Sequence, residues 1–312
     1  MPDKRLGIVL SGGGGKGAYQ IGVWKFLREA GLEKYVSALS GASVGALNSV
    51  LFASGNLEKA EELWLTKVQD AVLTQDEDVW ESRKNKGIKN LSMLFKNPLS
   101  AIGNLVYDAV EAAYNGICDR KGLCSLIDGN LNLSFIRSCP INLYAACTRI
   151  SGSSRAVFRL NDYEKDDVLK ILMASSAIPG VFPAQYIGHE QYYDGGLSDN
   201  CPVSALEDES CDEILVVHLK ESRGESVVSK SGCHVTEIFP SESLGRFFSG
   251  TLDFSPAHVE SCMDLGYTDC AMNRNGMGDR ILEMGKRLSD GKTGTQNLPH
   301  SEVPLDLPQN AI

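Results

Sequence analysis

The N-terminal part of the chain alternates between short apolar runs and helical patterns, with glycines where they meet. The apolar run over 6–10 ends in the glycines of 12–17, after which apolar residues recur at helical spacing up to Gly31. A second run over 36–40 leads into another helical pattern over 44–53. We therefore predict a right-handed, parallel β-α-β unit followed by a helix.

The pattern of apolar and polar positions also predicts further helices and strands. We expect helices over 57–68 and 166–174, and strands over 141–148, 156–160 and 214–219. Residues 221–234 resemble a loop, and 235–287 resemble helices with breaks. We accordingly expect a main α/β domain over 5–220, a helical C-terminal extension over 221–288 packed on it, and a disordered tail over 289–312.

Residues 70–117 differ in character from the segments on either side. Acidic and then basic residues are followed by an apolar, helix-rich stretch that is broken by Pro98 and several glycines. One interpretation is a helical insertion that packs its apolar side on the core. The other is a cap that admits acyl chains, because an apolar face beside lysines suits a membrane surface.

Composition narrows the class of protein. With 312 residues, 43% of them hydrophobic, the chain can bury a large core, and its net charge of −10 argues against a nucleic-acid partner. The nine cysteines are scattered and lack C-x-x-C spacing, so neither a disulfide framework nor a metal site is indicated. No signal peptide or apolar run of membrane-spanning length is visible. We expect a cytoplasmic protein that contacts membranes only at their surface.

The pentapeptide Gly41-Ala42-Ser43-Val44-Gly45 lies where a predicted strand meets a predicted helix. A serine at such a sharp turn has its hydroxyl lifted clear of the sheet, and small neighbours are needed because the backbone is crowded there. Glycine and serine also cluster in ordinary turns. Ser43 is therefore a candidate nucleophile that requires partners elsewhere in the chain.

The glycine-rich turn before the first helix has three possible uses: a dinucleotide cradle, a phosphate loop or an oxyanion hole. Its sequence satisfies G-x-G-x-x-G, but no acidic residue ends the second strand, and no Lys-Ser or Lys-Thr pair follows the glycines. We favour an oxyanion hole facing Ser43, with Gly13 and Gly14 as the best donors. The loop comprises Gly12, Gly13, Gly14, Gly15, Lys16 and Gly17.

A serine nucleophile also needs a base. A Ser-Asp-His triad is one option, but His189 is expected at a hairpin tip and His218 in an apolar strand or at its end. The other option is a dyad in which Asp194, followed by Gly195 and Gly196, accepts the proton directly once burial has raised its pKa. The dyad is favoured because no histidine is marked by a comparable motif.

The three glycine-marked segments, residues 12–17, 41–45 and 194–196, resemble in order and separation the signature blocks of the patatin-like phospholipase family. The resemblance covers about residues 5–220. It implies a three-layer α/β/α fold with a mainly parallel sheet, and a phospholipase A-type lipid acyl hydrolase without metal or diffusible cofactor. It assigns Ser43 as nucleophile, Asp194 as general base and Gly12 to Gly17 as oxyanion hole, and its substrate would be a membrane phospholipid or another lipid ester.

Two alternatives stay open. Some bacterial relatives in this family are switched on by cyclic nucleotides in antiphage defence, so the protein could be a membrane-degrading effector that requires a small-molecule activator. The glycine loop could also belong to a nucleotide-binding module without hydrolase activity. Neither the head group, the sn-position, the acyl chain nor the oligomeric state follows from the sequence.

Overall fold

A computed structural model describes residues 4–72, 120–221 and 232–290. Most of the predicted insertion over 70–117 and most of the predicted tail over 289–312 lie outside the described residues. The predicted β-α-β unit is present as β1 (Leu6–Leu10), α1 (Ala18–Glu29) and β2 (Val36–Ala42), with the short helix η1 (Gly14–Gly17) between the first two.

The other predicted helices and strands are present in order with small shifts in their ends, and further elements that were not predicted lie between them. Helices α2, α3, α4, α7 and α8 span Val44–Ala53, Leu57–Thr66, Val68–Val72, Lys121–Asn130 and Lys165–Ser175. Strands β3 to β7 span Asn142–Arg149, Ser154–Arg159, Gln185–Ile187, Glu190–Asp194 and Glu213–Val217. The expected helix over 57–68 is thus two helices that meet at Lys67.

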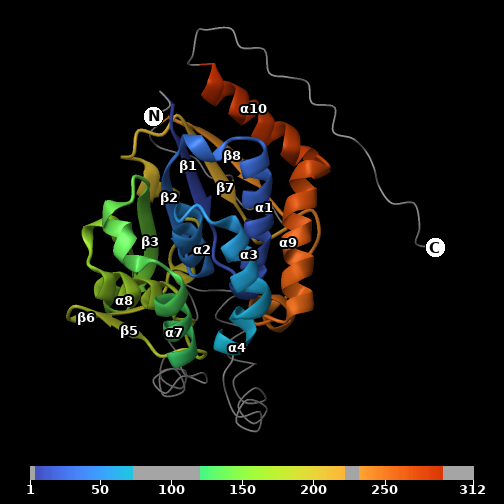
Figure 1. Cartoon of the computed structure of the whole chain (residues 1–312). Coiled ribbons are helices and arrows are strands. Elements are labelled where there is room, and N and C mark those ends of the chain that lie inside the picture. The colour runs from blue at the N-terminus through green and yellow to red at the C-terminus, as the bar shows by residue number, and fades with distance from the viewer. Residues whose placement is uncertain (1–3, 73–119, 222–231, 291–312) are drawn as a thin grey trace.

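One mixed sheet of eight strands forms the centre of the molecule (Figure 1). Its order is β5-β6-β3-β2-β1-β7-β8, where β8 spans His234–Ile238, and β4 pairs with β3. Strands β3, β2, β1, β7 and β8 are parallel, whereas β4 and β6 run antiparallel to β3. The carboxyl ends of β1 and β2 therefore meet at one edge, where Leu10 pairs with Gly41.

The two faces of the sheet are covered unequally. Leu6, Ile8 and Leu10 belong to the large apolar core shared with the long helices, because alternate side chains of β1 point to the same face. Val9 points to the opposite face and joins a smaller cluster with the short helix η7 (Val203–Leu206). The fold is the predicted α/β/α arrangement with a mainly parallel sheet. The thicker of the two outer layers covers the sheet face that carries the large core.

The C-terminal extension differs from the all-helical expectation. It begins with strand β8 (His234–Ile238), which extends the sheet beside β7, and continues as α9 (Pro256–Ala271) and α10 (Met277–Ser289). Helix α9 packs along α1 (Figure 1), and the Tyr19 hydroxyl donates a 2.9 Å hydrogen bond to buried Asp269. The extension therefore forms part of the same core.

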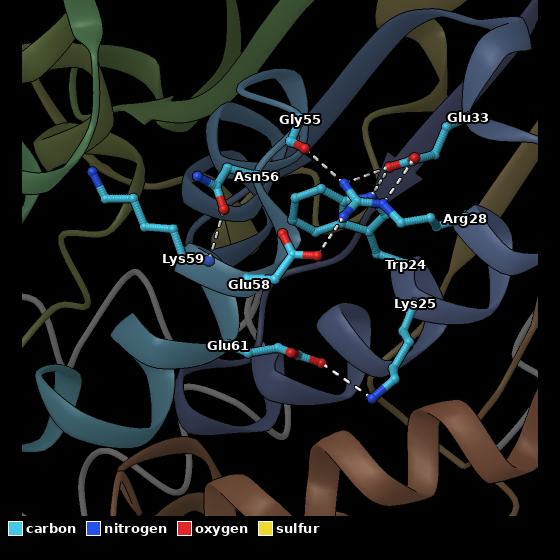
Figure 2. Close-up of polar contacts among 9 residues, drawn as sticks. All are labelled: Trp24, Lys25, Arg28, Glu33, Gly55, Asn56, Glu58, Lys59 and Glu61. Carbon is cyan, nitrogen blue, oxygen red and sulfur yellow. Dashed lines mark hydrogen bonds and ion pairs between the residues drawn. The ribbon is translucent and has the colours of Figure 1, made fainter.

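Ionic and polar contacts fix the end of α1 that is remote from the glycine loop (Figure 2). Arg28 forms an ion pair with Glu33 at 3.0 Å and donates a 2.7 Å hydrogen bond to the Gly55 carbonyl. Trp24 donates from its indole nitrogen to the same Glu33 carboxylate. These contacts tie the turn after α1 to the turn after α2, so both helices that begin near the predicted site are also held at their ends.

Candidate active site

Ser43 lies at the turn between β2 and α2, as the sequence predicts. Its φ of 55° and ψ of −127° place a non-glycine residue in a strained backbone region, and its side chain is only 5% exposed. A Cβ on Gly41 would lie 2.3 Å from the Gly45 carbonyl carbon, and one on Gly45 would lie 2.0 Å from the Leu10 carbonyl oxygen. The turn therefore requires both glycines, which is the property of a nucleophile elbow.

The glycine loop lies beside this elbow. The Gly12 N–H already donates to the Asn200 carbonyl at 3.3 Å, so Gly12 is a weaker candidate donor than Gly13 and Gly14. Gly14, with φ of 59°, and Ser43 both line the two cavities of this region. Gly14, at the start of η1, thus lies beside the candidate nucleophile, where a donor to an oxyanion would be needed.

Residues of the C-terminal extension pack closely against the glycine loop. A Cβ on Gly14 would lie 2.0 Å from the carbonyl oxygen of Thr251, which belongs to the single-turn π-helix η8 (Phe247–Thr251). A Cβ on Gly15 would lie 1.9 Å from the Asp253 carbonyl oxygen. The loop is therefore confined between the sheet and a segment more than 200 residues away in sequence.

Asp194 ends strand β6, and the register of the sheet brings it to the same edge as Ser43. Ala42 pairs with Ala146 of β3, and the next residue of β3, Cys147, pairs with Asp194. The Ser43 N–H donates to Ser175 Oγ at 2.9 Å, and that hydroxyl donates to the Ala146 carbonyl at 2.7 Å. Strand β3 therefore separates and aligns the two candidate catalytic residues.

The environment of Asp194 suits a general base. The side chain is buried, and burial raises its pKa to about 6, although the Ser43 hydroxyl, the Gly196 N–H and the Arg120 guanidinium favour the charged form. Oδ1 accepts a 2.8 Å hydrogen bond from Gly196. Among the described residues, Oδ2 accepts no hydrogen bond of normal geometry, so one carboxylate oxygen is left to receive a proton.

Three buried polar side chains that no sequence motif placed in the site connect the glycine loop to helix α2. Asn48 donates to the Gly17 carbonyl at 3.0 Å and to Gln20 Oε1 at 2.9 Å. Gln20 donates to the Ser11 carbonyl at 2.8 Å, and Trp64 donates to Asn48 Oδ1 at 3.1 Å. A polar Asn48 inside the apolar helix α2 was the available signal, because buried amides need partners.

An apolar cavity begins at Ser43. It encloses about 740 Å³ of empty space, including its open mouth, and is lined almost entirely by apolar side chains, among them Leu47, Leu51, Trp64, Val72, Ile127 and Phe254. Val72, the last described residue before 73–119, also lines the cavity. The cavity has the lining that a hydrocarbon chain requires.

Within the part of the chain that the structure describes, neither of the two histidines considered for a triad forms a hydrogen bond with Ser43. His189 is exposed at the β5–β6 turn, as the sequence predicts. His218 follows the end of β7, where its Nε2 lies 3.0 Å from Glu237, its Nδ1 lies 3.6 Å from Cys201 Sγ, and its ring stacks on Phe239. Both ring nitrogens of His218 therefore face groups other than the candidate dyad.

Comparison with known proteins matches most of the chain to a protein family. Residues 8–207 match the model of the patatin-like phospholipases. An uncharacterized NTE family protein of Mycobacterium tuberculosis is 24% identical over 261 residues, covering 83% of this chain and 38% of the relative. The lysophospholipase nte1 of Aspergillus terreus is 26% identical over 216 residues, covering 69% of this chain and 12% of the relative. The chain thus spans well under half the length of these relatives.

Among solved structures, VipD from Legionella pneumophila has a similar fold, with a TM-score of 0.53 and 16% sequence identity. The match covers 90% of this chain and 67% of VipD. None of the helices in the described part of the chain is long and apolar enough to cross a bilayer.

Proposed function

Because the chain belongs to the patatin-like phospholipase family, we propose that it is a lipid acyl hydrolase that cleaves fatty-acyl esters with Ser43 as nucleophile and Asp194 as general base. The observation that carries the proposal is the position of Ser43. A strained serine with a buried carboxylate and a glycine loop beside it lines an apolar cavity. Each of these features serves one part of ester hydrolysis in a long-chain lipid.

The reaction proceeds in two halves. The Ser43 hydroxyl oxygen attacks the ester carbonyl carbon while Asp194 Oδ2 accepts the hydroxyl proton, and N–H groups of Gly13 and Gly14 donate to the developing oxyanion. Collapse of the tetrahedral intermediate releases the alcohol, which takes the proton from Asp194. Water then attacks the acyl-enzyme while Asp194 accepts one of its protons, and that proton passes to the Ser43 oxygen as the acyl–oxygen bond breaks and the fatty acid leaves. The substrate is reached at a membrane surface, by peripheral contact.

The assay that tests the proposal is release of free fatty acid from 1-oleoylglycerol in neutral detergent micelles, by wild-type protein and by Ser43→Ala. Hydrolysis by the wild type alone supports the proposal. A protein that binds ATP or NAD and releases no fatty acid would instead favour the nucleotide-binding alternative. Repeating the assay with cyclic nucleotides tests the alternative of a regulated effector, because activity would then appear only with the activator present.

The pH profile should report the ionisation of Asp194. Since only the carboxylate can accept a proton, and burial raises the pKa of Asp194 to about 6, kcat/KM for a neutral ester should be constant above pH 7 and fall about tenfold per pH unit below pH 6. Initial rates between pH 5 and pH 8 check this. A profile that is flat down to pH 5 would contradict the assignment of Asp194 as base.

Replacing Gly14 by alanine should damage the oxyanion hole. The new Cβ would meet the Thr251 carbonyl at 2.0 Å in addition to the strain of a positive φ, so the loop must shift away from its N–H geometry. We expect a loss of kcat of about 100-fold.

Gly31→Ala is the matched control for this variant. Gly31 has a φ of 68°, and a Cβ added there would have no heavy atom within 4 Å, so the control carries the backbone strain without the clash. It should lose about 1 kcal/mol of stability and retain its kcat. Equal kcat values for the two variants would show that the position of Gly14 is unimportant for catalysis.

A further inference from the structure

A second cavity meets the apolar one at Ser43. The two share Gly14, Ser43 and Ile178 as lining residues, and the second encloses about 840 Å³ of empty space including its mouth. Its lining is more polar, and two lysines contribute to it: Lys16 from the glycine loop and Lys220 from the segment that follows β7. Family membership rests on residues 8–207, so Lys220 lies beyond the matched segment.

The two lysines give this cavity a positive potential. Asp194 is the third charged side chain among its described lining residues, so the lysines outnumber acids there. Within the described ranges, neither ammonium group lies within 4.0 Å of a carboxylate oxygen. Burial of Lys16 lowers its pKa and the charge of Lys220 acts in the same direction, whereas Cys262 and Glu221 oppose this shift. The two amines are therefore close enough to repel each other, which an anion between them would relieve.

The packing around Lys16 directs its side chain. A Cβ on Gly250 would lie 2.7 Å from Lys16 Cε, so the lysine stem runs against the backbone of η8 and cannot turn freely. Lys220 lines the same cavity and is exposed to solvent. The Lys16 amine is thus held on the wall of the second cavity, and the Lys220 amine is accessible from solvent. If the acyl chain of a substrate fills the apolar cavity, its alcohol side would occupy this second cavity.

We propose that this second cavity is a head-group subsite that accepts the phosphate of an anionic lipid, with Lys16 and Lys220 as its ligands. The proposal rests on the proposed function, because it assigns the alcohol half of the same ester. Lysine ammonium groups bind phosphate as point charges with several donors. The same two charges disfavour a head group that ends in a quaternary ammonium. Lys220 is then a specificity-determining residue of the hydrolase.

The test compares two substrates that differ only by the phosphate: 1-oleoyl lysophosphatidic acid and 1-oleoylglycerol, each diluted in neutral detergent micelles. For the wild type we expect kcat/KM to be about tenfold higher for the phosphate-bearing lipid. Lys220→Gln should remove most of that preference, mainly through KM of the phosphate-bearing substrate. Lys59→Gln, at an exposed lysine of α3 (Figure 2), is the matched control and should keep the wild-type preference.

Failure of this subsite can be distinguished from failure of the hydrolase. If the wild type hydrolyses neither lipid, the proposed function itself fails. If the wild type hydrolyses both lipids with equal kcat/KM, the head-group subsite is overturned. It is also overturned if Lys220→Gln prefers the phosphate-bearing lipid as strongly as Lys59→Gln does. A further arm adds inorganic phosphate to the 1-oleoylglycerol assay. Competitive inhibition in a protein that shows no preference for the phosphate-bearing lipid would assign the lysines to a free anion and overturn the lipid subsite.

Discussion

Ser43→Ala should reduce hydrolysis of long-chain esters by about a thousandfold or more, because no other group can form the acyl-enzyme. The fold should survive, since the side chain is small and its main-chain N–H still donates to Ser175. We expect the free energy of unfolding to change by less than about 1 kcal/mol, because the loss is a single hydroxyl at a site already strained. Fatty acid release and thermal unfolding of the same preparations measure both effects.

Ser54→Ala provides the matched control for the nucleophile. Ser54 lies at the C-terminal end of α2, the helix that Ser43 begins, and its hydroxyl donates to the Leu51 carbonyl. This variant should keep wild-type activity. If Ser43→Ala hydrolysed esters as fast as Ser54→Ala, the elbow would be a structural turn and not a catalytic one.

Asp194→Asn should abolish hydrolysis and at the same time stabilise the protein. The amide can still accept the Gly196 hydrogen bond, but it cannot take a proton from Ser43. Because folding raises the pKa of Asp194 to about 6, ionisation of the buried carboxyl opposes folding as the pH rises through that value. The neutral amide removes this cost, so we expect a gain on the order of 2 kcal/mol at pH 8 that disappears below about pH 4.

Chemical denaturation at pH 8 and pH 4 measures this gain. Asp199→Asn is the control, because Asp199 lies in the same loop but forms an ion pair with Arg155 and is partly exposed. It should show no comparable gain. An Asp194→Asn protein that remained active, or that was destabilised at pH 8, would contradict a buried carboxylate base.

Local patterns in the sequence were sufficient to predict the backbone at the edge of the sheet that carries the candidate catalytic residues. The β-α-β unit, the elbow at Ser43 and the turn after Asp194 are each coded by a few adjacent residues, because glycines and a short apolar run leave few alternatives for the backbone. The assignment of these residues to catalysis stays a prediction until the variants are measured.

Features that depend on contacts between distant segments could not be predicted from local sequence patterns. Strand β8 was expected to be helical, since five residues of mixed polarity become a strand only when β7 offers a paired edge. The contact of Thr251 with Gly14 joins distant segments, and no local pattern encodes it. The hydrogen bond from Ser43 to Ser175 likewise depends on the packing of α8 against β3.

A long-chain fluorophosphonate tests most directly whether Ser43 is a nucleophile activated without histidine. We expect one covalent adduct per chain in the wild type, and mass spectrometry should locate it on the peptide that contains Ser43. Labelling should fall by orders of magnitude in Asp194→Asn and persist in His218→Ala. An adduct on another residue, or esterase activity that survives complete modification of Ser43, would contradict the assignment of Ser43 as nucleophile.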